Sequence, residues 1–133
     1  MHRYAASVVV LLLVMSPRSV VSQQIAKPEM TVPSFNTLEP QVFPDGRKVR
    51  RIAAATVTMI KVEWPMGTST TPHNHAHELL LTVLQGRLRA IGGDRELVME
   101  PGDVVVIPAW VAHSYVAMED TLTLEAVGPE NPR

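Results

Sequence analysis

Turn-forming residues recur along this 133-residue chain at intervals of roughly 8 to 12 positions, with short β-branched and apolar runs between them. Clear turn signals are Pro44-Asp45-Gly46, Gly92-Gly93-Asp94 and Pro101-Gly102-Asp103. No segment sustains the apolar period of a helix. This pattern predicts an all-β fold, a sandwich or barrel of short antiparallel strands.

Three segments carry the clearest strand patterns. Residues 51–64 alternate in polarity, and the alternation changes phase at Met59-Ile60, which predicts two short strands or one strand with a bulge. Residues 79–84 and 104–107 are continuous apolar runs, and such runs are typical of strands covered on both faces.

The chain divides into four parts by composition. A basic start, an apolar run over residues 5–15 and a small polar stretch predict a secretory signal peptide over 1–22. The competing interpretation is an uncleaved membrane anchor, but the apolar run is shorter than the ~20 residues that a span needs. A proline-rich extended arm is expected over 23–50, one domain over 51–128 and a loose tail over 129–133.

Charge and cysteine content exclude several classes of function. Signal cleavage removes Arg3 and Arg18 and leaves ten basic against thirteen acidic residues, a net charge of about −3. This balance argues against binding to nucleic acid, and against binding to a membrane after cleavage. The chain has no cysteine, so disulfides, thiolate catalysis and cysteine-ligated metals are excluded. We expect an exported protein, periplasmic or secreted, with a small-molecule substrate.

Four of the five histidines lie beyond the signal segment, at positions 73, 75, 77 and 113. Alternate residues of a strand share a face, so His73 and His75 can direct two imidazoles at one point, and His77 can follow them. Imidazole is a ligand for first-row metals such as Fe, Zn, Ni and Mn. The sequence therefore predicts a divalent metal site, against the alternatives of an exposed histidine-rich loop or histidines bonded within a core.

Glycines and prolines are spaced regularly around these histidines in two segments. A glycine, five residues and His-x-His form the first, and a glycine, five residues, a proline and a histidine form the second. The residues concerned are Gly67, His73, His75 and Gly86, then Gly102, Pro108 and His113. Together the segments resemble the two motifs of the cupin superfamily, in its small single-domain type 2 form. The resemblance spans residues 67–117.

The resemblance implies a cupin jelly roll, a double-stranded β-helix barrel, with His73, His75 and His113 as metal ligands. The family's carboxylate or amide ligand would align with Leu79, and Glu78 is one residue short of it. Three coordination sets stay open: the three histidines alone, the histidines with Glu78 re-aimed by a bulge, and a set that includes His77 or holds no metal.

Two further departures occur in the second motif. Trp110 replaces a glycine, and Ala117 stands where the family has asparagine. Trp110 fits only with a negative φ or with backbone strain.

A three-histidine site resembles that of cupin dioxygenases, so the leading hypothesis is an iron-dependent dioxygenase acting on a small organic substrate; Zn, Mn or Ni are the other metals considered. The alternatives are a metal-dependent isomerase or lyase on sugar or uronate derivatives, and a non-catalytic small-ligand-binding cupin. Tyr115, which shares the parity of His113, and Glu78 are the expected catalytic residues for proton transfer. Small cupins of this type tend to pair, and a homodimer is expected.

Overall fold

The computed structural model describes residues 28–129. The chain divides into two compact units, residues 1–31 and 32–133, and the few described residues of the first form no helix or strand. The predicted signal peptide and the end of the predicted tail lie outside the described residues. Within them, no helix has the length and apolar character that a membrane span requires.

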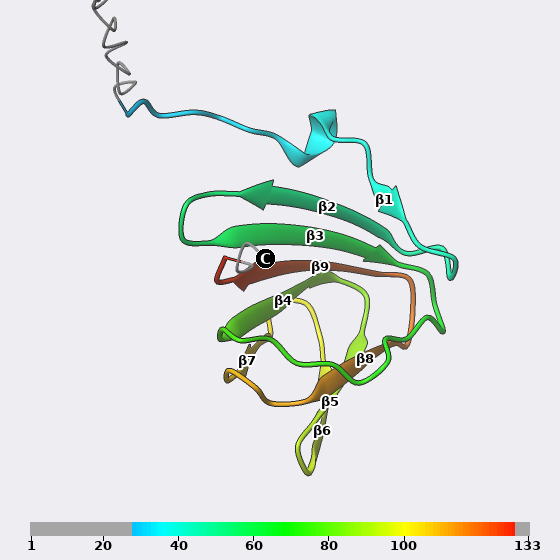
Figure 1. Ribbon diagram of the computed structural model, residues 1–133. Coiled ribbons are helices and arrows are strands. Elements are labelled where there is room, and N and C mark those ends of the chain that lie inside the picture. Colours follow the sequence, from blue (N-terminus) through cyan, green and yellow to red (C-terminus); the bar gives the residue numbers. More distant parts are fainter. Residues whose placement is uncertain (1–27, 130–133) are drawn as a thin grey trace, which may run out of the picture. The chain divides into compact units, whose positions relative to one another are not determined.

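The second unit consists of two antiparallel sheets, which confirms the predicted all-β class. One sheet has six strands in the order β1-β2-β3-β9-β4-β7, and the other has three in the order β6-β5-β8. Figure 1 shows β2, β3, β9 and β4 lying side by side in the larger sheet. The strands are β1 Gln41–Val42, β2 Lys48–Ala53, β3 Thr58–Trp64, β4 Leu79–Gln85, β5 Leu88–Gly92, β6 Arg95–Met99, β7 Val104–Ile107, β8 His113–Ala117 and β9 Thr121–Val127, with a short 3-10 helix at Phe35–Thr37.

The core forms from alternate residues of these strands. In β4, Leu79, Leu81 and Val83 are at most 1% exposed, whereas Leu80 and Leu84 are 43% and 44% exposed. The prediction that this apolar run is covered on both faces is therefore wrong, because the outer face of β4 remains open to solvent.

The same correction applies to β7. Val104 and Val106 are 59% and 53% exposed, and Val106 lies opposite Leu80 in the adjacent strand. The outward apolar residues of β4 and β7 thus gather on the outer surface of one sheet.

Strand β3 is continuous and regular. It pairs with β2 and with β9 without a shift of register from Thr58 to Trp64, so no break or bulge lies at Met59-Ile60. Residues 51–64 do contain two strands, the end of β2 and all of β3, and the break between them lies at residues 54–57. Residues 58–61 are all half-buried, and alternation between buried and half-buried residues begins only at Val62. The register does shift on β4, between Val83 and Gln85 against β9.

Part of the segment predicted as an extended arm belongs to the large sheet. Gln41 of β1 pairs with Val49 of β2, and Val49 is 6% exposed in the core. Sheet pairing therefore begins before residue 51, at which the domain was predicted to start.

Two tight turns depend on glycine. The predicted hairpin at Gly92-Gly93-Asp94 joins β5 and β6, with Gly93 at a φ of 60°. Gly86 follows β4 with a φ of 79°, and a Cβ there would lie 2.3 Å from the carbonyl oxygen of Asp120. No other residue type fits at Gly86 without displacing the backbone.

Candidate metal centre and its cavity

A backbone bridge brings His73 and His113 together across 40 residues of sequence. The N–H of His73 donates to the carbonyl oxygen of His113 at 3.0 Å, and the N–H of His113 donates to that of His73 at 2.8 Å. Their ring centroids are 4.4 Å apart. The loop before β4 is thereby fixed against the first residue of β8.

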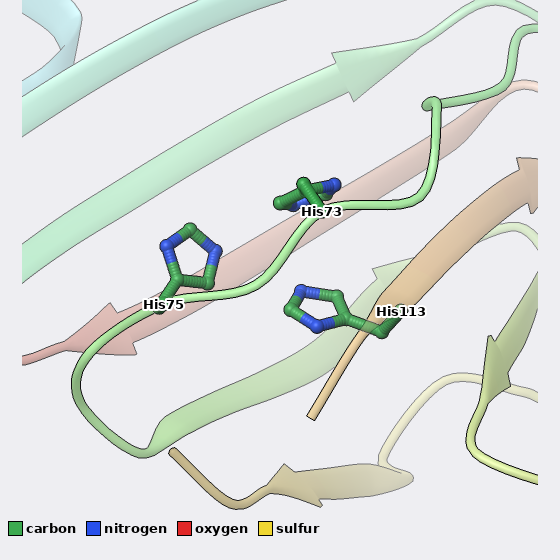
Figure 2. Close-up of side chains that lie close together, drawn as sticks. All are labelled: His73, His75 and His113. Carbon is green, nitrogen blue, oxygen red and sulfur yellow. The ribbon is translucent and has the colours of Figure 1, made fainter. Parts of the chain in front are cut away.

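His75 completes the group from the same loop. Its carbonyl oxygen accepts a hydrogen bond of 2.8 Å from the N–H of Trp110. Its ring lies 5.1 Å from that of His73 and 5.3 Å from that of His113. Figure 2 shows the three rings around a common space, and one ligand nitrogen from each lies within 4.8 Å of the others.

The two bridged histidines have their ring orientation fixed by main-chain acceptors. Nδ1 of His73 is 2.9 Å from the carbonyl oxygen of Thr71, and Nδ1 of His113 is 2.8 Å from that of Val111. With Nδ1–H donating to a carbonyl, Nε2 is the unprotonated nitrogen that a metal needs. Burial lowers the pKa of His113; the hydrogen bond to Val111 opposes this and nearby His73 adds to it.

These residues fit a divalent metal ion. His113 is 3% exposed, and its Nε2 is buried without a hydrogen-bond partner among residues 28–129. Buried polar atoms are rarely left unpaired, and a metal ion is the partner that three convergent imidazoles can share.

The structure does not bring Glu78 to this group. Glu78 is exposed, while the next residue, Leu79, enters the core at 1% exposure. Glu78 precedes the first residue of β4 and is not among the residues whose ligand atoms converge.

His77 also lies outside the three-histidine group. Its ring packs against Gly128, where a Cβ would come within 2.5 Å of the ring carbon Cγ. His77 nevertheless lines the adjoining cavity, and its Nε2 is buried without a hydrogen-bond partner among residues 28–129.

A cavity of about 470 Å³ adjoins His73 and His75. Val49, Val62 and Trp64 form its apolar wall. Such a volume suits a small organic ligand. Trp110 is 68% exposed and does not line this cavity; its φ of 66° shows that the chain accepts strain at the glycine position of the motif.

Tyr115 lies beside the three-histidine group and lines the cavity. Its ring centroid is 5.5 Å from that of His113 and 5.9 Å from that of Trp64. The hydroxyl is buried without a hydrogen-bond partner among residues 28–129. Burial, with a contribution from Glu125, raises the pKa of Tyr115 above its ordinary value. The structure thus brings Tyr115, unlike Glu78, to the histidines.

Three charged residues that were not predicted also line the cavity: Arg47, Arg51 and Glu125. Glu125 is 9% exposed, and burial raises its pKa from the ordinary value of 4.5 to about 7, although Arg51 and Arg47 act in the opposite direction. Arg51 could have been predicted from the sequence, because it lies two residues after the apolar Val49 in β2 and alternate residues of a strand share a face.

The family model of the cupin domain matches residues 60–127, about half of the chain. The chain belongs to the cupin family. No curated protein is significantly similar to this cupin.

Solved structures support the same fold. KdgF from a Halomonas species is 24% identical, with a TM-score of 0.71, 77% of this chain covered and 96% of that chain. An RmlC-like cupin from Shewanella frigidimarina is 17% identical, with a TM-score of 0.71 and coverages of 77% and 94%.

A larger protein also shares the fold over part of its length. Salicylate 1,2-dioxygenase from Pseudoaminobacter salicylatoxidans, as a mutant in complex with gentisate, is 20% identical with a TM-score of 0.62, but only 26% of that chain is covered, against 66% of this one. At these identities the likeness shows the fold alone, and it confirms the predicted cupin jelly roll.

Proposed function

We propose that this cupin is a metal-dependent dioxygenase that uses iron and acts on a small organic substrate. One observation carries the proposal: three imidazoles converge without a carboxylate in the group and adjoin a cavity of about 470 Å³. A site with three protein ligands leaves coordination positions open for substrate, which a catalytic metal needs and a structural one lacks.

When bound, iron would supply open positions for substrate and oxygen. The residues of the chain orient the imidazoles, exclude water and offer a hydrogen-bond donor to the substrate. The carbonyls of Thr71 and Val111 fix two of the rings, so little reorganisation is needed on binding. Val62 and Trp64 exclude water from the cavity wall, and the buried hydroxyl of Tyr115 is available to donate a hydrogen bond to the substrate. The fold relationship to a salicylate dioxygenase is in keeping with this proposal.

A second candidate, a metal-dependent isomerase or lyase, is favoured by Glu125. A buried carboxyl with a pKa of about 7 can both take up and release a proton near neutral pH. Its position in the cavity wall would let it serve a reaction in which a carbonyl substrate is polarised while a proton moves. Sugar or uronate derivatives are the substrates proposed for this alternative.

The test is metal content together with oxygen uptake. The mature protein, prepared without a histidine tag under anaerobic conditions, should contain near-stoichiometric iron and consume oxygen with a member of a panel of thiols, diketones, phenols and uronates. Another metal with turnover but no oxygen uptake would replace the dioxygenase by the isomerase or lyase. Absence of any metal would leave a small-ligand-binding cupin.

Variants test the ligand set directly. His73→Ala and His113→Ala should each abolish metal retention, because either change leaves two imidazoles. His77→Ala is the matched control from the same loop and should keep the metal, as should Glu78→Ala. Metal loss in the Glu78 variant equal to that in the histidine variants would contradict the three-histidine assignment.

Export through cleavage near residue 22 and assembly as a homodimer belong to the proposal as well. The length of the secreted chain, measured by mass spectrometry, tests the first, and the mass of the particle in solution tests the second.

A further inference from the structure

Arg47 and Arg51 line the same cavity as His73 and His75. Arg47, Val49 and Arg51 occupy alternate positions, so they share one side of the chain, and Val49 is a core residue. Arg51 lies opposite Ile60 of β3, which lies opposite Glu125 of β9. Arg51 and Glu125 therefore stand in one row on the inner face of the large sheet.

Arg47 is held in place before any ligand arrives. Its Nε donates to the carboxylate of Asp45 at 2.7 Å, and its guanidinium lies over the rings of Phe43 and Trp64 at 4.9 and 5.3 Å. The bond to Asp45 is the only hydrogen bond of this guanidinium within residues 28–129. Since a guanidinium carries five N–H donors, most of them remain for a ligand.

Arg51 carries a charge that no neighbouring carboxylate neutralises. Its Nη1 donates to the amide oxygen of Gln41 at 2.8 Å, which is a neutral partner. Among residues 28–129 no carboxylate lies within 4.0 Å of its guanidinium. Glu125 lies in the same row but holds its proton to higher pH than an ordinary carboxyl.

The charge of the cavity is thus incomplete. Asp45 balances Arg47. Arg51 has no carboxylate within 4.0 Å among residues 28–129, and Glu125, whose pKa of about 7 leaves it only partly ionised near neutral pH, offsets only part of the Arg51 charge. A carboxylate has one negative charge and two oxygens that match the fork of a guanidinium. The apolar wall of Val49, Val62 and Trp64 suits the organic body that such a group would carry.

We infer that the cavity accepts a small organic acid, with its carboxylate on Arg51 and Arg47 and its other, oxygen-bearing end toward the three histidines. This inference rests on the proposed function, since it names the substrate class of the same site. It also predicts which acids bind: those short enough to fit about 470 Å³ and carrying a second oxygen group at the far end.

Binding of paired acids and amides tests this inference. Benzoate and benzamide, salicylate and salicylamide, and glucuronate and glucuronamide differ within each pair mainly in charge. Dissociation constants are measured by titration calorimetry on the zinc-loaded protein and on the metal-free protein, with inorganic phosphate as a further probe. At least one acid should bind about tenfold more tightly than its amide, the size expected of a charge-assisted hydrogen bond.

Variants on one strand identify the residues responsible. Arg51→Gln should abolish the preference for the acid, and Arg51→Lys should keep part of it because the charge remains without the fork. Arg50→Gln is the matched control: Arg50 is the adjacent residue, pairs with Glu63 and does not line the cavity. Its acid preference should equal that of the wild type. Metal content, measured on each variant, should not change.

The outcomes separate this inference from the proposed function. Equal effects of Arg51→Gln and Arg50→Gln, no binding by any acid, or phosphate binding as tightly as the best acid would each overturn the organic-acid assignment while leaving metal retention intact. A wild-type protein without affinity for metal would overturn the proposed function. An acid preference that persists in the metal-free protein and is lost in Arg51→Gln would still support the carboxylate subsite.

Discussion

Replacing Glu125 by glutamine should stabilise the protein at pH 8 and have little effect at pH 4.5. The carboxyl is 9% exposed, and its pKa rises from the ordinary 4.5 to about 7, chiefly through burial, with Arg51 and Arg47 opposing the rise. Below pH 4.5 the group is protonated in both the folded and the unfolded chain, so burial of the neutral acid carries no ionisation penalty.

The penalty develops between these two pKa values. Between pH 4.5 and 7 the unfolded chain loses the proton while the folded chain keeps it, so the unfolded state binds fewer protons and stability falls as pH rises. Above pH 7 both states are ionised and the loss is complete. A pKa difference of about 2.5 corresponds to roughly 3 kcal/mol, as an order of magnitude, and glutamine keeps the size of the side chain without this loss.

The assay is thermal unfolding of the wild type and Glu125→Gln at several pH values from 4.5 to 8.5. Both proteins are treated with a chelator, because a bound cation would favour the ionised carboxylate. A difference of 3 kcal/mol corresponds to a shift in Tm on the order of 10 °C or more for a domain of this size. Groups that do not interact with Glu125 are common to both proteins and cancel in the comparison.

Glu78→Gln makes the same change of charge at an exposed position and is the control. A difference between wild type and Glu125→Gln that stays constant with pH, or a variant less stable than wild type at pH 8, would refute the assignment of a destabilising buried carboxylate.

Four further substitutions test the packing of the core and the backbone at two positions with positive φ. Trp110→Gly should stabilise the fold by about 0.5–1 kcal/mol, because φ is 66° and the side chain is 68% exposed; a lower Tm would argue that the indole packs usefully. Gly86→Ala should destabilise by more than about 2 kcal/mol, since its Cβ would meet the Asp120 carbonyl at 2.3 Å; a Tm equal to wild type would contradict this. In urea unfolding, Leu81→Ala should lower the free energy of unfolding by about 2–5 kcal/mol. Leu80→Ala should lower it by much less, because Leu80 is 43% exposed. Equal losses in the two variants would contradict the inward assignment of Leu81.

The strand positions and the convergence of His73 and His75 could be predicted because both depend on local information. Turn residues mark the ends of strands, and the alternation of a strand directs His73 and His75 to one side. The pairing of His73 with His113 is not local, and the resemblance of the two glycine-histidine segments to the cupin motifs supplied it. Residue-level burial was harder, because Leu80 and Val106 are apolar residues that this chain leaves on the outer surface.

The charged wall of the cavity was missed for a related reason. In β9 the residues that face inward are Thr121, Thr123, Glu125 and Val127, which are buried, while Leu122 and Leu124 are only half-buried. Hydrophobicity alone would place the leucines inside. In the structure Glu125 faces inward instead, in register with Ile60 of β3. Because Ile60 lies more than 60 residues earlier in the sequence, local patterns could not reveal this orientation.

The inward face of β9 is largely polar, because Thr121, Thr123 and Glu125 are buried there. A polar inward face costs stability, as the raised pKa of Glu125 indicates, and Thr123 offsets part of that cost by accepting a 2.9 Å hydrogen bond from the indole N–H of Trp64. Glu125 has no such bond or ion pair within residues 28–129. A buried carboxyl that lines the same cavity as Arg51, His73 and His75 and has a raised pKa is a candidate functional group.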